Sequence, residues 1–283
     1  MERYHYIKNN INPIAISFGK INIYWYGLIF FLIFIIFRLF LIKKISKNNQ
    51  KIKISKIENL LNLIFFGACI GGRLGYIFFY NFSLFLSDPY CIFYIWKGGM
   101  SFHGGLVGVT VSIWIYSQLT QKKFLEITDS IVTLIPIGIG LGRMGNFING
   151  ELWGKVTFDI PWAIIFPRSI RDDIEYVMRN PKLIPFFKEF SALPRHPSQI
   201  YEMFLEGFCL FLILNALEKR NLPTGILSAI FLILYGAFRI LVEIFRQPDY
   251  QTNPFYGWNI GQILSLPMII FGLFIYLNVL KNR

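Results

Sequence analysis

Seven apolar runs, each able to cross a lipid bilayer, dominate this chain of 283 residues. A span needs about 20 mostly apolar residues, and backbone polar groups in lipid must bond within their own segment, which predicts helices. The sequence therefore predicts an all-α polytopic membrane protein with a single transmembrane domain. The expected spans are Ile21–Ile42, Ile57–Tyr80, Gly104–Leu119, Ile127–Ile148, Ser198–Leu217, Thr224–Arg246 and Trp258–Leu280.

The composition fits a membrane protein and argues against a soluble one. Charged residues make up 16% of the chain and hydrophobic residues 54%, whereas soluble domains carry about 25% charged residues. The net charge of +12 is explained better by loop lysines beside anionic lipid than by nucleic acid, because no basic stripe alternates with base-stacking aromatics. Met1–Lys20 has no basic stretch followed by a cleavable apolar core, so we expect the first span to be retained.

Lysines and arginines in the short loops predict the orientation of the spans. One side carries only Arg3, Lys8, Lys20 and Lys97, together with the long loop Asn149–Pro197, in which seven basic residues are offset by six acids. The opposite side should face the cytoplasm, so the N-terminus and the long loop face outward. That basic side carries twelve residues: Lys43, Lys44, Lys47, Lys51, Lys53, Lys56, Lys122, Lys123, Lys219, Arg220, Lys281 and Arg283.

The long outer loop, residues 149–197, is expected to form a small cap rather than a separate domain. It contains a strand-like stretch, Pro161–Phe166, and a charged stretch compatible with a helix, Ser169–Met178.

Two rows of glycines predict close helix packing. Gly67, Gly71 and Gly75 recur at four-residue spacing in the second span, and Gly104 and Gly108 do so in the third. Small residues at this spacing let helix backbones approach one another.

Charged residues inside the spans lie toward the outer side. Arg73, Arg143 and Arg239 all occupy the outer parts of their spans, and at about 1.5 Å per residue Arg73 and Arg239 sit roughly 10 Å inside the boundary. Each such charge costs about 2.5–3.5 kcal/mol at mid-bilayer on insertion scales, so these groups must meet one another, water or a ligand. We therefore expect a polar cavity in the outer half of the bilayer.

The surplus of positive charge in this layer predicts a phosphate site. Tyr235, Arg239, Glu243 and Arg246 are spaced by four, four and three residues, which places them on one helix face. Arginine forks suit phosphate oxygens, and a lipid phosphate is the nearest anion. An internal network of salt bridges that only fixes helix packing remains an alternative.

One glycine pattern is misleading. Gly140, Gly142 and Gly145 match G-x-G-x-x-G, but no strand precedes them and no βαβ unit surrounds them, so dinucleotide binding is not predicted. The three cysteines are scattered and form no CxxC pair, and the sequence predicts neither a metal site nor a cofactor.

Several blocks of sequence resemble the phosphatidylglycerol–prolipoprotein diacylglyceryl transferase family. The most specific is the run Gly142–Gly154, with the sequence Gly-Arg-Met-Gly-Asn-Phe-Ile-Asn-Gly-Glu-Leu-Trp-Gly. Ser101–Gly108, Arg195–Glu202 and Tyr235–Asp249 resemble further family blocks, and Gly71–Tyr76 is a weaker match. The resemblance covers essentially the whole chain in order.

The resemblance implies seven transmembrane helices in a bacterial inner membrane, with a periplasmic N-terminus and a cytoplasmic C-terminus. It also implies a reaction in which the thiol of a lipobox cysteine, on a prolipoprotein signal peptide, attacks the glycerol carbon that bears the phosphate ester of phosphatidylglycerol. The products are a thioether-linked diacylglyceryl group and glycerol 1-phosphate. The expected partners are these two substrates and the membrane.

Such a step needs an acceptor for the thiol proton and cations around the departing phosphate. We expect Arg143 and Arg239 to stabilise the phosphate, with support from Arg246 and Arg73. His103, which two glycines follow, is the best candidate for the proton acceptor. A hydrogen-bonded residue at a helix start is the alternative for His103.

Other residues are expected to bind or orient the lipid head. The resemblance supports Tyr26 and Asn146 as hydrogen-bonding partners of the head; interfacial anchoring and helix capping are the respective alternatives. Glu151 and Glu243 should orient arginines, and Gly154 should permit a backbone turn.

Two other functions remain open from the residues alone. A transporter or flippase for an anionic lipid would be expected to show inverted repeats and broken midplane helices, and neither is evident in the sequence. A lipid-binding scaffold without catalytic activity is the other alternative.

Overall fold

The computed structural model describes residues 5–19, 21–47, 54–94, 99–247 and 259–281. The chain forms two compact units, whose boundaries fall within the first long helix and near the end of α5. The large unit comprises Met1–Ile35 and Val132–Arg283, and the small unit comprises Ile36–Ile131.

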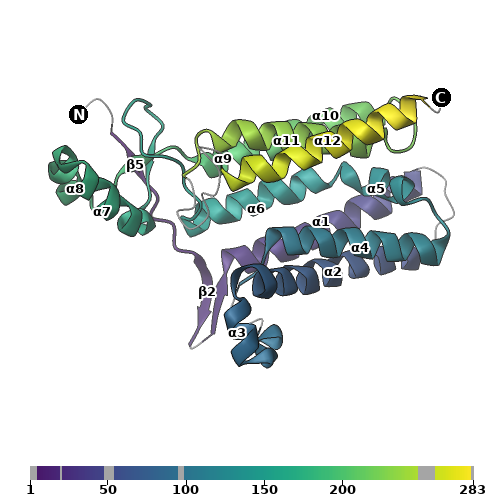
Figure 1. Cartoon of the computed structure of the whole chain (residues 1–283), viewed down its shortest axis with the longest axis horizontal. Coiled ribbons are helices and arrows are strands. Elements are labelled where there is room, and N and C mark those ends of the chain that lie inside the picture. The colour runs from purple at the N-terminus through teal and green to yellow at the C-terminus, as the bar shows by residue number, and fades with distance from the viewer. Residues whose placement is uncertain (1–4, 20, 48–53, 95–98, 248–258, 282–283) are drawn as a thin grey trace. The chain divides into compact units, whose positions relative to one another are not determined.

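Long helices that run side by side form the body of the large unit (Figure 1). Buried apolar side chains of α10 and α11, among them Leu210, Leu214 and Phe231, form its core together with Val132 and Tyr235. A π-helix, Met203–Cys209, joins α9 to α10, so these three elements make one continuous span. The helices are α1 (Trp25–Lys47, of which the first part belongs here), α6 (Ile135–Asn149), α9 (Ser198–Glu202), α10 (Leu210–Glu218), α11 (Ile226–Glu243) and α12 (Ile260–Lys281).

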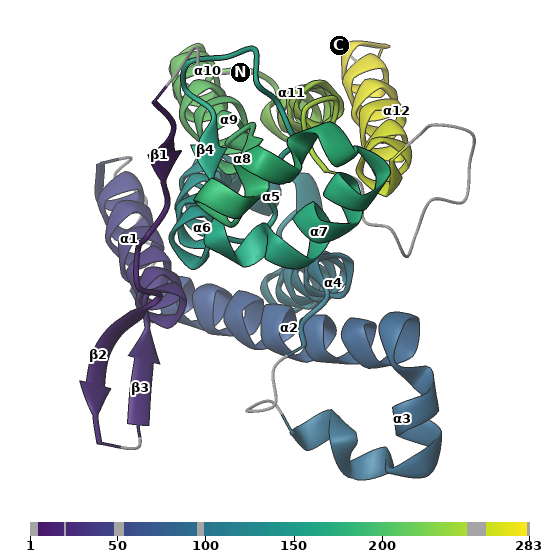
Figure 2. The same ribbon diagram turned by 90° about the vertical axis from the view of Figure 1, so that its left-hand side faces the viewer.

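Residues 149–197, called the cap below, lie in the large unit at one end of these helices and contain short helices and strands. Figure 2 shows α7 (Ile170–Arg179) and α8 (Ile184–Phe190) in front of the helix ends. A three-stranded sheet joins the cap to the N-terminal segment: β1 (Ile7–Lys8) pairs in parallel with β4 (Ile164–Ile165), which pairs antiparallel with β5 (Pro194–Arg195). The expected strand within 161–166 and helix within 169–178 are thus confirmed.

The start of the first span was predicted wrongly. Residues from Ile21 onward were expected to be helical, but β2 (Ile14–Phe18) and β3 (Ile21–Tyr24) form an antiparallel hairpin, and α1 begins only at Trp25. Gly19 turns the chain back with a φ of +58°, a conformation that glycine adopts at little cost. The short apolar run Ile21–Tyr24 therefore completes a hairpin instead of extending the helix.

The small unit is organised around two helices in backbone contact, α2 (Ile54–Tyr80) and α4 (Phe102–Thr120). A Cβ atom on Gly71 would lie 2.3 Å from the carbonyl oxygen of Gly104, and one on Gly67 would lie 2.6 Å from that of Gly108. The predicted close packing at both glycine rows is confirmed. The remaining elements are α3 (Phe82–Ser87), a 3-10 helix at Pro89–Phe93, α5 (Phe124–Val132) and the second part of α1.

The expectation of seven spans is confirmed only in part. Within the described residues, five helices are long and apolar enough to cross a membrane, or six if the bent pair α5 and α6 counts as one span. The expected helix over 127–148 is broken between Val132 and Ile135, where Pro136 occupies the first turn of α6, a position that suits proline. The spans are Trp25–Lys43, Lys56–Phe78, Ser198–Glu218, Ile226–Glu243 and Gly261–Lys281.

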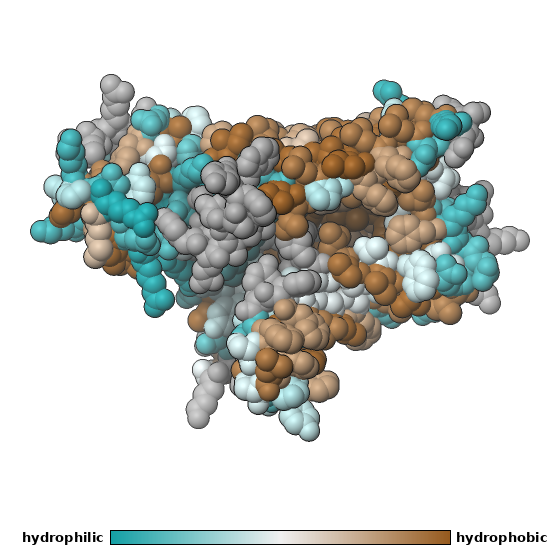
Figure 3. Space-filling model, in the orientation of Figure 1, coloured by the Kyte–Doolittle hydropathy of each residue, from teal (hydrophilic) through white to brown (hydrophobic). Residues whose placement is uncertain are grey.

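The surface of the large unit is divided by polarity. In Figure 3, apolar residues cover the region of α10, α11 and α12, whereas polar residues cover the cap. Large apolar side chains exposed over a whole helix suit contact with lipid tails, where no polar partner is available. On α12 these side chains are Leu264, Leu266, Ile270, Phe271, Leu273, Phe274, Leu277 and Leu280.

Candidate functional site

The candidate site lies in the large unit, at the ends of α6, α9 and α11 that are nearest the cap. Nε of Arg143 on α6 lies 3.2 Å from Oε2 of Glu202 at the end of α9. Arg239 on α11 donates a hydrogen bond to Oε1 of the same carboxylate. Glu202 is completely buried. Of the three arginines expected to meet from separate helices, Arg143 and Arg239 do so, and Arg73 belongs to the small unit.

A second buried carboxylate, Glu206, faces the same two arginines. Its Oε2 atom lies 3.4 Å from Nη2 of Arg143, and its Oε1 atom lies 3.6 Å from Nη1 of Arg239. Glu206 belongs to the π-helix Met203–Cys209, and single π-helical turns often occur at functional sites. Glu206 was not among the expected site residues, although its spacing of four from Glu202 inside an apolar run is a signal for it.

Glu243 and Arg246 complete the network at the end of α11. Nη2 of Arg239 lies 3.0 Å from Oε2 of Glu243, and Nη1 of Arg246 lies 3.6 Å from Oε1 of Glu202. The expectation that Arg246 continues the face of α11 is wrong, because the helix ends at Glu243. Arg246 instead pairs with Gly154 through an antiparallel bridge, and its side chain reaches the network from there.

A second cluster of polar side chains lies between Arg143 and the C-terminal end of α6. Asn146 donates a hydrogen bond of 2.8 Å from Nδ2 to Oε1 of Glu151, and its side chain also hydrogen bonds to Tyr26. The ring of Tyr26 lies against Gly145, where a Cβ atom would come within 2.9 Å of Cδ2. The C-cap of α6 is Gly150, so Asn146 is not the capping residue.

Gly154 lies in the middle of three short extended segments. Its amide donates a hydrogen bond of 2.9 Å to the carbonyl of His196, and it pairs with Arg246 on the other side. A Cβ atom at this position would lie 2.5 Å from the His196 oxygen and 2.7 Å from that of Phe245. Glycine is therefore needed here for the close approach of three backbones and not for a turn with positive φ.

A buried ion pair between Arg195 and Asp173 joins the cap to these segments. Arg195 is 1% exposed and Asp173 is 0% exposed, and Nη2 lies 2.5 Å from Oδ1. Nη1 of Arg195 donates to the carbonyl of Gly154 at 3.0 Å, while Oδ2 of Asp173 accepts from Ser169 Oγ at 2.6 Å. No spacing or motif in the sequence predicts this pair, because the two residues are 22 positions apart.

His196 lies beside the site without taking part in the ion-pair network given by the structure. Its Nδ1 atom is 3.2 Å from the hydroxyl of Tyr201. Burial, assisted by the positive charge of Lys155, lowers the pKa of His196 below its ordinary value. The imidazole is thus held neutral at neutral pH, which suits a packing residue.

Arg73 and His103 belong to the small unit. Arg73 donates hydrogen bonds to three backbone carbonyls, at 2.6 Å to Cys91, 3.1 Å to Gly99 and 3.3 Å to Ile92. It therefore holds the segment before α4 in place. His103 lies in the first turn of α4, and its side chain is outside the described part of the structure. The substrate roles expected for both residues stay predictions.

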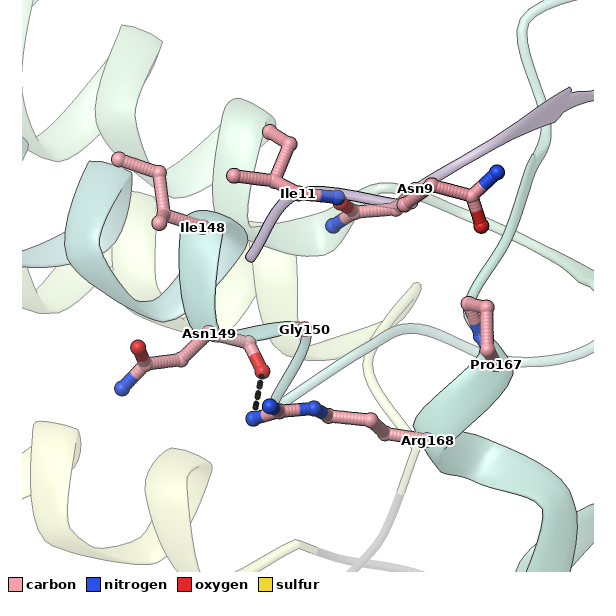
Figure 4. A pocket seen from close by; sticks show the side chains of 8 residues that line it. Asn9, Ile11, Ile148, Asn149, Gly150, Pro167 and Arg168 are labelled. Atoms are coloured by element: carbon pink, nitrogen blue, oxygen red, sulfur yellow. Dashed lines mark hydrogen bonds between the residues drawn. The ribbon is translucent and has the colours of Figure 1, made fainter. Parts of the chain in front are cut away.

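A small cavity of about 190 Å³ lies beside the end of α6. Arg168 spans it and donates a hydrogen bond of 2.7 Å to the carbonyl oxygen of Asn149 (Figure 4). The side chain of Asn149 also contacts Oε1 of Glu151 at 3.5 Å, so the cavity borders the Asn146 group. Its lining consists of Asn9, Asn10, Ile11, Ile148, Asn149, Gly150, Pro167 and Arg168.

Comparisons with known proteins give one consistent result. The family model described as prolipoprotein diacylglyceryl transferase matches residues 13–278. The phosphatidylglycerol–prolipoprotein diacylglyceryl transferase of Proteus mirabilis (strain HI4320) is 50% identical over 264 residues, which cover 93% of this chain and 90% of the relative.

Two further relatives carry the same name. The protein of Photorhabdus laumondii subsp. laumondii is 47% identical over 97% of this chain and 94% of its own length. The protein of Blochmanniella floridana is 48% identical over 94% of this chain and 95% of its own length. The similarity thus extends over nearly the full length of both chains in each comparison.

Proposed function

The chain belongs to the prolipoprotein diacylglyceryl transferase family, and we propose that it transfers the diacylglyceryl group of phosphatidylglycerol to the lipobox cysteine of prolipoproteins. This is the first step of lipoprotein maturation. The cysteine sulfur forms a bond to the glycerol carbon, and the bond from that carbon to the phosphate oxygen breaks. The products are a thioether and glycerol 1-phosphate. The observation that carries the proposal is the convergence of Arg143 and Arg239 on the buried carboxylate of Glu202.

Arg143 and Arg239 bind the phosphate and stabilise the charge that develops as it departs. Two guanidinium groups held at one place present several N–H donors in planar forks, which match the oxygens of a phosphate. Glu202 and Glu243 hold these side chains in position before the lipid arrives. Donors that are already oriented stabilise a developing charge without the cost of reorganisation. Arg246, 3.6 Å from Glu202, supports the same charge.

Tyr26 and Asn146 orient the glycerol part of the head group. The hydrogen bond between their side chains and the one from Asn146 to Glu151 support this role, because they fix two polar groups close to Arg143. A hydroxyl and an amide can each donate to and accept from the hydroxyls of a glycerol. Glu151 acts here by orienting Asn146, and Gly154 lets the segment after it pass close to Arg246.

His103 accepts the proton of the lipobox thiol. The nucleophile must be the thiolate, and an imidazole is the side chain that most readily exchanges a proton near neutral pH. The support for this role is its place in a block that resembles the family's histidine motif. Arg73, expected to contribute to lipid binding, acts through Cys91, Ile92 and Gly99, whose carbonyl oxygens accept its hydrogen bonds.

The proposal includes an arrangement of one transmembrane domain in the bacterial inner membrane. Seven spans, with α4 as the third, place the N-terminus and the cap in the periplasm and the C-terminus in the cytoplasm. The concentration of lysines and arginines on the opposite short loops supports this orientation.

Purified protein, phosphatidylglycerol and a synthetic lipobox peptide test the function directly. The expected product is a peptide whose mass has increased by a diacylglyceryl group on cysteine, with release of glycerol 1-phosphate. A peptide with serine in place of that cysteine should remain unmodified. Absence of the adduct from folded protein with both substrates would contradict the proposal. Movement of the lipid between leaflets without any adduct would support the flippase alternative, which the family comparisons do not favour.

A further inference from the structure

The network around Glu202 is balanced in charge before any lipid binds. Within the described residues, the guanidinium groups of three arginines lie within 4 Å of the carboxylates of three glutamates. A bound phosphodiester would add one negative charge to a site buried between apolar helices. Uncompensated charge in such surroundings is costly, and a titratable group commonly changes its protonation instead. The members of this network are Arg143, Arg239, Arg246, Glu202, Glu206 and Glu243.

The three carboxylates are not held equally well. Glu202 is contacted by all three arginines, and Glu243 lies 3.0 Å from Arg239. Glu206 is as deeply buried as Glu202, yet its contacts with arginine are 3.4 and 3.6 Å long. Each of the three carboxylates has one buried oxygen that receives no hydrogen bond within the described residues, so this feature does not separate them. Glu206 differs in that its nearest guanidinium nitrogen is farther away, at 3.4 Å, than that of Glu202 or Glu243, and its charge is therefore the least compensated.

The groups that face Glu206 come from three elements. Arg143 approaches from α6, Arg239 and Tyr235 from α11, and Glu202 from the preceding turn of its own span. A tyrosine phenol ordinarily loses its proton only near pH 10, so Tyr235 is not a group that takes up a proton near neutral pH. The arginines stay protonated at any pH that the protein tolerates. A proton taken up near neutral pH must therefore go to a carboxylate.

We propose that Glu206 takes up a proton from the solvent when phosphatidylglycerol binds, which frees Arg143 and Arg239 to hold the lipid phosphate. This inference rests on the proposed function, because it takes the phosphate to bind at these two arginines. The proton keeps the charge of the site balanced, and no bond of the lipid forms or breaks in this step. A protonated Glu206 also gains an O–H donor, which a carboxylate lacks.

Calorimetric titration of the full-length protein in nanodiscs with phosphatidylglycerol, without peptide, tests the proposal. Repeating the titration in buffers with different ionisation enthalpies gives the number of protons taken up per lipid. Wild-type protein should take up about one proton near neutral pH, as linkage requires when a group changes from charged to neutral on binding. Glu206→Gln should take up none, and Glu206→Asp, which can still titrate, should restore the uptake.

The matched control is Glu175→Gln, which removes an exposed carboxylate of α7 that pairs with Arg179. It should take up as many protons as the wild type.

Binding of the lipid to wild-type protein with no proton uptake would overturn the proposal, and so would unchanged uptake in Glu206→Gln. If the Gln variant does not fold, the pH dependence of the affinity of the wild-type protein for the lipid tests the proposal instead. This affinity should weaken by up to tenfold per pH unit at alkaline pH, and a constant affinity would overturn the proposal.

The transfer assay separates this inference from the function on which it rests. Wild-type protein that modifies the lipobox peptide but binds its lipid without proton uptake would retain the function and lose the inference. Wild-type protein that takes up a proton on binding but forms no adduct would contradict the proposed reaction alone.

Discussion

Arg143 on α6 and Arg239 on α11 share one buried carboxylate, that of Glu202. Two positively charged guanidinium groups this close together would repel each other without an anion between them. The carboxylate holds both in place, so a lipid phosphate would meet donors that already point to one position. This relation explains why acidic residues belong in a site for an anionic substrate.

Replacing Arg143 or Arg239 with alanine should lower kcat for transfer by about 10²–10³-fold, the usual loss when an oriented donor to a developing charge is removed. Lysine at either position should restore little activity, because its ammonium group is a point charge and lacks the planar, forked N–H donors of a guanidinium. The rate is measured by the mass of the peptide adduct. Arg179→Ala, an exposed arginine of α7, is the control and should keep the wild-type rate. Normal turnover of Arg143→Ala would show that the ion pairs serve packing alone.

Gly145→Ala and Gly142→Ala form a matched pair on α6. A Cβ atom at 145 would come within 2.9 Å of the ring of Tyr26, whereas one at 142 would have nothing within 4 Å. The first variant must displace the ring of Tyr26, so its transfer rate should fall clearly while the second keeps its rate. The adduct assay measures both, and equal rates would argue against a need for Tyr26 at its observed position.

Asp173→Ala should destabilise the protein by about 3–5 kcal/mol, because it leaves the buried guanidinium of Arg195 without its counterion. Thermal unfolding in detergent measures the change. Glu175→Ala, two residues along the same helix, removes an exposed ion pair and should cost no more than about 1 kcal/mol. Similar unfolding temperatures for the two variants would mean that the buried pair does not hold the cap to the Gly154 segment.

The stability of the protein should fall as the medium becomes mildly acidic, in part through His196. Burial and Lys155 lower the pKa of this imidazole in the folded state, so the unfolded chain binds a proton at higher pH than the folded one. The contribution of His196 to the free energy of unfolding is present in full above the ordinary histidine pKa of about 6.5. It is lost as the pH falls from there through the lowered pKa of the folded state. Unfolding curves between neutral and acidic pH should be less steeply pH-dependent for His196→Gln. Identical pH dependence would assign the effect to other groups.

Parts of the fold and of the site could be predicted from local patterns in the sequence. Glycines at four-residue spacing predicted the backbone contact between α2 and α4, because only small residues allow it. Charged residues inside apolar spans predicted that Arg143 and Arg239 would find partners, since an unpaired charge there is too costly. The segment around Arg143 also resembles a family signature, and that resemblance supported Asn146 as a hydrogen-bonding partner of the lipid head. Glu151 was expected to orient arginines, whereas the structure shows it accepting a hydrogen bond from Asn146.

Other features depend on contacts that are distant in sequence. The helix-like apolar run at Ile21–Tyr24 became a strand because Gly19 turns it back onto β2. The pairing of Arg195 with Asp173 requires the cap to fold over β5, and nothing in the spacing of the two residues reveals it. The spacing of four between Glu202 and Glu206 places both acids on one face of their span, but the arginines that contact Glu206 come from α6 and α11 and only the fold reveals them.

An experimental structure of the protein in a bilayer with phosphatidylglycerol bound tests most directly whether these arginines hold the substrate. The phosphate oxygens are expected within hydrogen-bonding distance, about 2.7–3.2 Å, of guanidinium nitrogens of both Arg143 and Arg239. A lipid phosphate bound elsewhere, with both arginines still engaged only by Glu202, Glu206 and Glu243, would contradict the proposed site.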